Sequence, residues 1–465
     1  MRPTRPARRA AVTAEAPLYY ETLAFSNLKC FRNEHNVNLC DRDGRPSLWT
    51  LLLGENGVGK TTVLQMLAWM RPAPPPVGRQ TIEPTLFGET DNSLLLKLVR
   101  QDHAAVELSV QASFTSRATT VSAAPTVTLH TGIIVKTAAG DPLAGPSEKL
   151  TDVRLGKNST GSASDLPVIA YGANRQIGIQ NLGDPVLTDP VSMLFAPTTT
   201  LYDPESILRD LDYAKSKKKA GAAMRLGQFL ALIATIAPRI GRVDHIRFLG
   251  PSIDADRGKL TGVQFHNFFG WVSFSEMSLG QQTTIALAVD LAWRLVRLYP
   301  KSERPLAEPA IVLVDEIDLH LHPRWQRDLR GYLTQHFPAV QFIATAHSPL
   351  MAQASLDANL VVFQEEDGQI SIWNDADRLL DWRLDQVVTA LFGLQSARPP
   401  TVQVMFDERD KLVDLSERTA AQEARLIELK GRIAGLSAPN SEIDETAIDI
   451  IRRAAARLGR APTQA

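Results

Sequence analysis

The stretch Gly-Glu-Asn-Gly-Val-Gly-Lys-Thr-Thr at residues 54–62 combines glycines, a lysine and hydroxyl side chains at a spacing suited to binding phosphate. Glycines allow the sharp turns in which successive backbone N–H groups converge on an anion. The lysine can reach the β- and γ-phosphates of a nucleotide, and the first threonine hydroxyl can bind Mg²⁺. The predicted nucleotide-binding residues are Gly54, Glu55, Asn56, Gly57, Val58, Gly59, Lys60, Thr61 and Thr62.

Two further groups of polar residues follow apolar runs. Asp315 and Glu316 come directly after Ile311–Val314, and His347 ends the run Gln-Phe-Ile-Ala-Thr-Ala. Asp315 suits a Mg²⁺-bound water, Glu316 could polarise an attacking water, and His347 could hydrogen-bond a γ-phosphate. The alternatives are a plain strand cap for the acids and a structural role for the histidine.

The segment Ser-Leu-Gly-Gln-Gln at 278–282 precedes a long apolar helical pattern. Ser278 and the backbone of Gly280 would therefore lie at a helix N-terminus, which is a natural anion site. Because one phosphate loop is already present, a second phosphate site must serve another nucleotide end or another subunit. Taken alone, this pattern is weak evidence.

Secondary-structure signals place these residues on an α/β framework. A buried strand at 51–53 leads into the loop, and a helix over 60–70 follows it and stops at the proline-rich segment 71–77. Residues 87–200 read as a β-rich arm inserted into the nucleotide fold, with a flexible loop at 137–165. A helical segment over 201–244 opens with Asp203 as N-cap and Pro204 at the first helical position.

Composition excludes several classes of protein. The chain has 465 residues, and its 50 Lys and Arg nearly balance 51 Asp and Glu, so any basic surface must be local. Its only cysteines, Cys30 and Cys40, lack metal-ligand spacing and fit a reducing compartment. No apolar run approaches a membrane span, and residues 1–20 form a basic arm without a signal-peptide core. We therefore expect a cytoplasmic protein.

The densest basic run is Lys-Ser-Lys-Lys-Lys at 215–219. A solvated loop face is the usual explanation for such a run. Contact with a nucleic-acid backbone is the alternative, and it makes DNA a possible partner.

The order of phosphate loop, Ser-x-Gly, Asp-Glu and histidine resembles the ABC-type ATPase superfamily. In that superfamily the Ser-x-Gly element of one subunit closes over the ATP held by its partner. The resemblance implies a homodimer or higher homo-oligomer around ATP and Mg²⁺, with an α/β fold and a mixed sheet. It assigns catalysis to Glu316 and His347, Mg²⁺ to Thr61 and Asp315, and contact with the facing ATP to Ser278, Gly280 and Gln281.

Within the superfamily, Asp-Glu-Ile-Asp-Leu-His-Leu-His-Pro and Ala-Thr-Ala-His-Ser-Pro are similar to the RecF, SMC and OLD branch. The similarity implies that Asp318 crosses to the partner subunit and that His320 and His322 are structural. The family more often has Pro-Glu where this chain has Ile317-Asp318. Gln176 is the candidate for the glutamine that senses Mg²⁺.

The last part of the chain carries a heptad pattern. Leucine and isoleucine fall on the a and d positions of one frame at Leu412, Leu415, Leu426, Leu429, Ile433 and Leu436, interrupted by Thr419 and Gln422. A shorter helix is expected near 446–458. This extension could pack on the ATPase or bind another subunit. The expected parts are an arm at 1–20, ATPase lobe halves at 21–86 and 245–395, the insertion at 87–200, helices at 201–244 and an extension at 396–465.

The size, the arm and the lack of a recognisable nuclease centre resemble stand-alone anti-phage defence ATPases of the Septu-type PtuA or PARIS type. That resemblance implies an ATPase that gates or scaffolds a separate effector, expected to be a nuclease. The alternative is a RecF-like DNA-repair ATPase without a toxic effector. A transporter ATPase is disfavoured, because Lys60 and Ser278 lie too far apart along the chain for a compact transporter subunit.

Overall fold

The chain forms two compact units, Met1–Gly393 and Leu394–Ala465. The computed structural model describes residues 17–71, 107–116, 128–137, 150–160, 166–178, 190–195, 199–237, 240, 242–249, 262–268, 270–374, 384–391, 396, 398–415 and 417–434. Residues 1–16 of the predicted basic arm at 1–20 lie outside these residues, as does the predicted helix near 446–458. Residues 18–20 of that arm instead belong to a strand, Leu18–Ser26. Among the described helices, none is both long and apolar enough to span a membrane.

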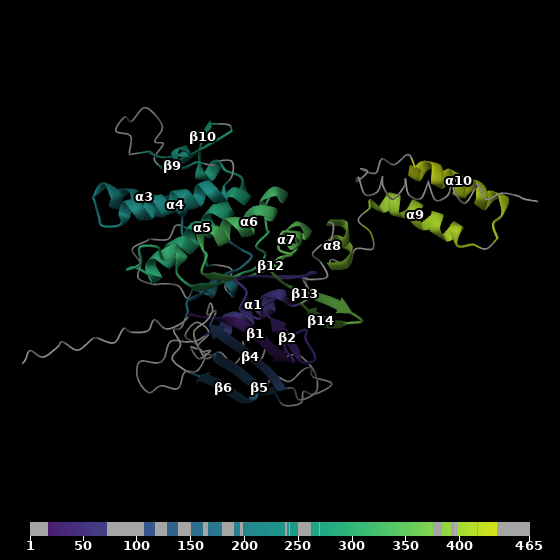
Figure 1. Cartoon of the computed structure of the whole chain (residues 1–465), viewed down its shortest axis with the longest axis horizontal. Coiled ribbons are helices and arrows are strands. Elements are labelled where there is room, and N and C mark those ends of the chain that lie inside the picture. The colour runs from purple at the N-terminus through teal and green to yellow at the C-terminus, as the bar shows by residue number, and fades with distance from the viewer. Residues whose placement is uncertain are drawn as a thin grey trace, which may run out of the picture. The chain divides into compact units, whose positions relative to one another are not determined.

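A mixed six-stranded sheet forms the centre of the first unit (Figure 1). Its strands, in spatial order, are β14 (Gln369–Trp373), β13 (Asn359–Glu366), β3 (Trp49–Gly54), β12 (Val340–Ala346), β11 (Ala310–Val314) and β7 (Val168–Tyr171). All neighbours pair in parallel except β13 and β14. The carboxyl ends of β3, β11 and β12 therefore meet at one edge, where ligands bind in open α/β sheets. The predicted α/β class with a mixed sheet is confirmed.

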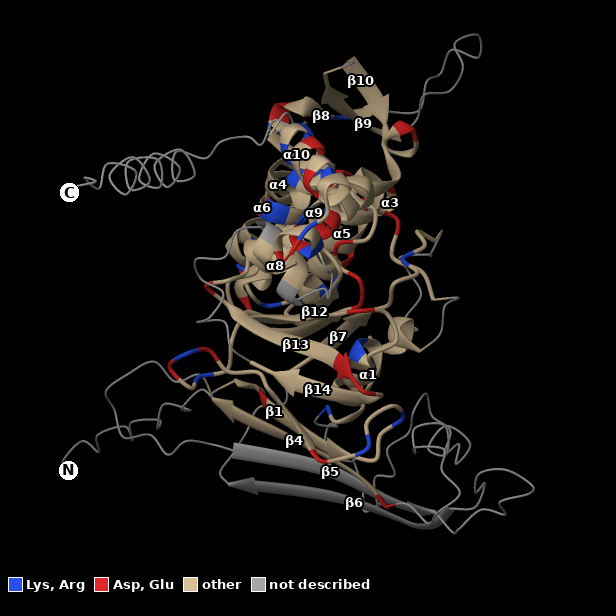
Figure 2. Ribbon diagram, turned by 90° about the vertical axis from the view of Figure 1, so that its right-hand side faces the viewer, with Lys and Arg blue, Asp and Glu red and all other residues tan. Residues whose placement is uncertain are grey.

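Alternate residues of β3 face opposite sides of this sheet, as the period of a strand requires. Leu51 and Leu53 join the apolar core on the helical side, whereas Leu52 joins the core on the other side. The α-helices that contribute to the first core are α3 (Pro204–Ser216), α4 (Ala222–Ile236), α5 (Leu279–Leu298), α6 (Pro323–His336), α7 (Pro349–Gln353) and α8 (Leu384–Leu391). The second core contains residues of α1 (Lys60–Trp69) and of a second sheet (Figure 2).

The second sheet has five antiparallel strands. In spatial order they are β2 (His35–Asn38), β1 (Leu18–Ser26), β4 (Glu107–Ser116), β5 (Thr128–Thr137) and β6 (Leu150–Thr160). The predicted insertion at 87–200 thus continues a sheet that begins with β1 and β2. Two details of that prediction are wrong: residues 150–160 form a strand within the expected loop, and β7 returns to the central sheet beside β11.

The first unit also contains a small third sheet and several short helices. A three-stranded sheet of β8 (Ile246–Leu249), β9 (Gly262–Asn267) and β10 (Gly270–Ser273) precedes α5 in sequence. Single-turn 3-10 helices complete the described elements: η1 (Ser192–Leu194), η2 (Val243–His245), η3 (Phe274–Glu276) and η4 (Pro305–Ala307).

A buried polar network fixes α5 against the central sheet. The side chain of Asp290 is 0% exposed and accepts hydrogen bonds from Arg294 Nε at 2.6 Å and from the Tyr171 hydroxyl at 2.7 Å. Its other oxygen accepts the backbone N–H of Tyr202 at 2.9 Å, just before α3. At the start of α3, Asp203 accepts from the N–H groups of Glu205 and Ser206, so its predicted N-cap is confirmed. Because a buried carboxylate is costly unless paired, this network sets the position of α5.

In the second unit, α9 (Pro400–Val413) and α10 (Ala420–Ala434) pack side by side (Figure 1). Leu426 and Leu429 are buried, and Arg425 Nε donates to Glu408 Oε1 at 2.8 Å across the pair. The predicted single heptad frame is wrong, because the chain leaves the helix between residues 414 and 419.

Candidate functional site

The phosphate loop connects the end of β3 to the start of α1. Gly59, the residue before α1, has φ 92°, a left-handed conformation that favours glycine. A Cβ atom there would lie 2.5 Å from the Phe31 ring, so a larger residue would also clash. The sequence of this turn therefore dictates its shape.

Lys60 holds the loop from inside. Its ammonium donates to the carbonyl oxygens of Gly54 at 2.9 Å and Glu55 at 2.6 Å. Burial lowers the pKa of Lys60 to about 8, while the surrounding carboxylates, Asp315 first, oppose that shift. The ammonium is thus already placed at the loop, where phosphate oxygens could replace the two carbonyls.

Thr61 and Asp315 meet at the carboxyl edge of the sheet. The Thr61 hydroxyl lies 3.1 Å from Asp315 Oδ1 and 3.0 Å from Oδ2. Thr345, on the neighbouring strand β12, donates its hydroxyl to Asp315 Oδ1 at 2.7 Å and so fixes the carboxylate. A hydroxyl beside a carboxylate offers the oxygen ligands that Mg²⁺ prefers, with water in the remaining positions. The donor set therefore fits this ion.

Glu316 follows Asp315 in a left-handed conformation with φ 47°. A non-glycine residue in this region costs about 1–2 kcal/mol and needs support from its surroundings. The support comes from both sides: its N–H donates to Thr345 Oγ1 at 2.7 Å, and its carbonyl accepts from Arg175. Its side chain is half-buried, so the carboxylate remains accessible while its backbone is clamped.

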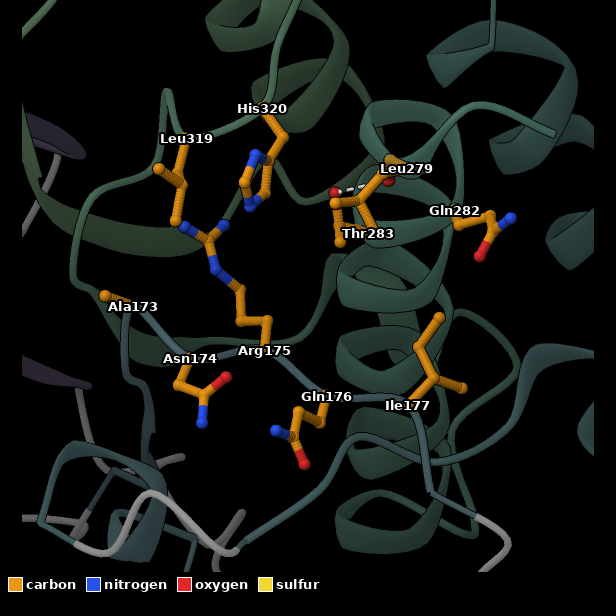
Figure 3. Close-up of a pocket in the computed structure, with 10 residues that line it drawn as sticks. All are labelled: Ala173, Asn174, Arg175, Gln176, Ile177, Leu279, Gln282, Thr283, Leu319 and His320. Atoms are coloured by element: carbon orange, nitrogen blue, oxygen red, sulfur yellow. Dashed lines mark hydrogen bonds between the residues drawn. The ribbon is translucent and has the colours of Figure 1, made fainter. Parts of the chain in front are cut away.

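Arg175 reaches this backbone from the segment after β7 (Figure 3). Its Nη2 also donates to the carbonyl oxygen of Asp315 at 3.1 Å. Burial lowers the pKa of Arg175 to about 10, and the nearby carboxylates, Asp318 first, partly offset the shift. The guanidinium thus stays charged at neutral pH and ties β7 to the two acidic residues.

His347 lies at the end of β12, and its backbone N–H donates to Asp318 Oδ2 at 2.9 Å. Burial, followed by the charge of Lys60, lowers the pKa of its imidazole, so His347 is neutral at pH 7. Within this chain the Asp318 side chain is buried by this contact. Its expected role toward a partner subunit stays a prediction.

The N-terminus of α5 is organised by its own residues. Ser278 caps the helix, and Gln281 returns the contact through Oε1 to the Ser278 N–H at 3.2 Å. Gly280 packs against the loop that contains His320, because a Cβ atom at position 280 would lie only 2.2 Å from the His320 carbonyl oxygen. Ser278, Gly280 and Gln281 line a cavity of about 870 Å³ with His320, Leu321 and the first residues of α6. None of these lining residues belongs to the phosphate loop.

The other predicted residues lie around these two centres. Glu55, Asn56 and Gly57 are exposed at the top of the loop, whereas Val58 and Thr62 are buried beneath it. His322 accepts the Arg324 N–H at the start of α6, which confirms its structural role. Within the described part of the chain, no cluster of three or more His, Cys, Asp or Glu could hold a metal ion.

Gln176 lies one residue beyond Arg175 and lines a cavity of about 700 Å³ with Thr283 and His320 (Figure 3). Its backbone carbonyl accepts the Leu201 N–H at 2.8 Å. The contact with the acidic residues comes instead from Arg175, which the sequence interpretation missed. The signal in the sequence that could have identified Arg175 is its position shortly after the apolar run that forms β7. Thr345 was missed as well, because a threonine inside an apolar run reads as part of the core.

Comparison with known proteins places these features among named relatives. A family model described as "AAA domain, putative AbiEii toxin, Type IV TA system" matches residues 186–352. The Retron Vc95 probable ATPase of Vibrio cholerae serotype O1 biovar El Tor is 45% identical over 96 residues, which are 21% of this chain and 19% of that protein. Septu protein PtuA of Bacillus mycoides (strain KBAB4) is 24% identical over 433 residues, or 90% of this chain and 50% of that protein.

Among solved structures, the SmcHead bound to the C-winged helix domain of ScpA aligns with a TM-score of 0.40 and 15% identity, covering 77% of this chain and 97% of that chain. The chain spans half or less of the length of the curated relatives that it matches. The expected similarity to Septu-type PtuA is confirmed.

Proposed function

We propose that this chain is an ATPase that binds and hydrolyses ATP at the carboxyl edge of its central sheet. The observation that carries the proposal is the meeting of Thr61 and Asp315 within 3.1 Å beside the buried ammonium of Lys60. A hydroxyl, a carboxylate and a lysine at the end of a glycine loop bind a metal–triphosphate complex better than any other common ligand.

Each residue has a defined part in this proposal. Lys60 and the loop N–H groups bind the phosphates, while Thr61 and Asp315 hold Mg²⁺, which neutralises charge on the phosphate oxygens. Glu316 accepts a proton from the attacking water, and the neutral imidazole of His347 donates a hydrogen bond toward the γ-phosphate. Thr345 and Arg175 keep the two acids in place, since they hold the Asp315 carboxylate and the Glu316 backbone.

The second half of the site is proposed to come from another copy of the chain. Ser278, Gly280 and Gln281 present a helix N-terminus, which favours phosphate binding. Their hydrogen bonds in this chain are local, so they remain available for the ATP held by a partner. We therefore propose a homodimer with two ATP molecules at its interface, formed by ATPase halves at residues 21–86 and 245–395.

The names of the relatives support a biological setting. Similarity to Septu PtuA and to retron ATPases favours anti-phage defence, in which this ATPase gates or scaffolds a separate effector, expected to be a nuclease. The proposal places this action in the cytoplasm. Purification of the tagged chain with the products of its neighbouring genes tests for the effector, and the absence of any co-purifying nuclease would contradict that part.

The ATPase proposal is tested by phosphate release from Mg²⁺-ATP. Asp315→Asn should lose at least about 10²-fold in rate, because a neutral amide replaces the charged ligand of the ion. Asp367→Asn makes the same chemical change at an exposed turn with φ 52°, which asparagine tolerates, and should behave as wild type. Equal rates for both variants would contradict the proposed site.

A further inference from the structure

A separate cavity lies among α3, α4 and α5, which contact one another on the helical side of the sheet (Figure 1). Its volume is about 460 Å³, and its polar lining consists of Asp210, Lys219, Arg225, Trp293 and Arg297. None of these residues belongs to the proposed ATP site. Three cations against one carboxylate make the lining positive.

The two arginines of this lining have unused donors. Arg225 is anchored by Nη2 to the Pro300 carbonyl oxygen at 2.9 Å, while its Nε is buried without a hydrogen-bond partner among the described residues. Arg297 Nη1 and Trp293 Nε1 are likewise buried without a hydrogen-bond partner among the described residues. Buried donors are costly when unpaired, and charged donors most of all, so these three donors need an acceptor that the described residues do not supply.

The surface next to the cavity is basic as well. Lys215 at the end of α3 and Lys217, Lys218 and Lys219 on the turn that follows are exposed. Tyr213, near the end of α3, is 60% exposed, and the Lys217 ammonium lies 5.5 Å from its ring centroid. The acids on this stretch of α3 are Asp210 and Asp212, so the positive charge is only partly offset.

We propose that this cavity binds a phosphate group, whose oxygens accept hydrogen bonds from Arg225 and Arg297. Phosphate offers the charge and the several acceptors that two guanidinium groups require. A nucleic-acid backbone and a free phosphorylated molecule both supply this group. The lysines continue the positive charge beyond the cavity, and the exposed tyrosine offers a face for a base, so a nucleic-acid strand fits the whole surface best.

The test compares Arg225→Gln/Arg297→Gln with a matched control, Arg327→Gln/Lys430→Gln, which removes two exposed charges elsewhere. In the first arm, anisotropy of a labelled 30-nucleotide single-stranded DNA is followed at several salt concentrations. The cavity variant should bind about tenfold more weakly, with a salt slope lower by about 0.7, since the cavity holds one phosphate of a single strand. In the second arm, calorimetry with inorganic pyrophosphate should show two sites in wild type and one in the cavity variant.

The two arms separate the sources of the phosphate. A change in the DNA arm supports a nucleic-acid strand, whereas a change with pyrophosphate alone supports a small phosphorylated ligand. Unchanged phosphate release from ATP shows that the cavity variant is folded. If wild type binds neither probe, or if the cavity variant matches the control in both arms, the proposal is overturned.

Discussion

At the carboxyl edge of the central sheet, side chains from four segments of the chain hold one another in place. Thr61 and Thr345 both contact the Asp315 carboxylate, and Arg175 binds the peptide that follows it. At the N-terminus of α5, by contrast, the hydrogen bonds of Ser278 to described residues stay within its own helix turn, to Gln281 and Gln282. We call the first region, which is held by contacts between distant segments, the finished region, and the N-terminus of α5, which is held by local contacts, the second region.

In our proposal, this difference couples catalysis to assembly. A helix leaves its first N–H groups without partners inside the helix, and Leu279 in this first turn is 55% exposed. The α5 terminus is therefore proposed to bind the phosphates of ATP held by a second copy. Changes in the finished region should then act within one chain, whereas changes in the second region should act on its partner.

The largest effect is expected for Lys60→Ala. ATP binding and hydrolysis should both fall to background, because the phosphates lose their main point charge and the loop loses its two internal hydrogen bonds. Calorimetry with ATP measures the binding, and Lys301→Ala, an exposed lysine, serves as the control. ATP affinity equal to wild type would show that this region is not the nucleotide site.

Glu316→Gln should keep binding and lose chemistry. The amide retains the shape of the side chain, while loss of a general base typically lowers the rate by about 10²–10⁴-fold. ATP should then accumulate in a dimer that is visible by size-exclusion chromatography, whereas Glu366→Gln, at an exposed position, should change neither property. Hydrolysis within a fewfold of wild type would remove Glu316 as the catalytic carboxylate.

Arg175→Gln should affect kcat more than ATP affinity. Loss of a residue that positions catalytic groups costs about 10–100-fold, and Arg175 contacts only backbone oxygens of Asp315 and Glu316 among the acids. Arg175→Lys should recover part of kcat, because it keeps the charge with a less rigid donor. If both variants lose kcat to the same extent and both also unfold at a lower temperature than wild type, the role of Arg175 is purely structural.

The smallest effect concerns pH. Lys60 in the free protein has a pKa of about 8, lowered by burial, so its neutral form predominates above that pH. Phosphate binding requires the ammonium; the charge of Lys60 should therefore leave ATP affinity unchanged up to about pH 7 and lower it about tenfold by pH 9. Lys60→Arg, which stays charged, should bind more weakly at pH 7 and show no such fall. A wild-type affinity that is flat to pH 9.5 would contradict the assignment.

The finished region was the easier one to predict from sequence. The spacing from Gly54 to Thr61 and the two acids after an apolar strand each encode a local structure, and parallel strands then bring them together. The clamp by Arg175 and Thr345 was not visible, because it depends on which strands are neighbours and not on any local pattern. The contact between Asp318 and the His347 backbone was missed for the same reason, since His347 follows β12, which pairs with the strand before Asp318.

The outer parts of the chain show a second limit. The alternation that predicted β strands does not specify which sheet they join, so the pairing of β4 with β1 was not foreseen for the predicted β-rich arm. The heptad frame predicted for the second unit is interrupted at Thr419 and Gln422, whereas α9 already ends at Val413 and α10 begins at Ala420. Apolar spacing alone does not show where the first helix ends, because Leu415 still fits the frame.

The central claim, that active sites are shared between chains, is tested most directly by mixing two inactive variants. Ser278→Arg should bind ATP as a single chain but block closure, while Lys60→Ala should leave the α5 terminus intact. In a mixed dimer one pocket carries both defects and the other carries neither.

Equal mixing should restore about a quarter of wild-type hydrolysis, because half of the dimers are mixed and half of their pockets are intact. Co-purification of differently tagged chains must show that subunits exchange. A mixture no more active than the two separate samples, under conditions of proven exchange, would contradict shared sites.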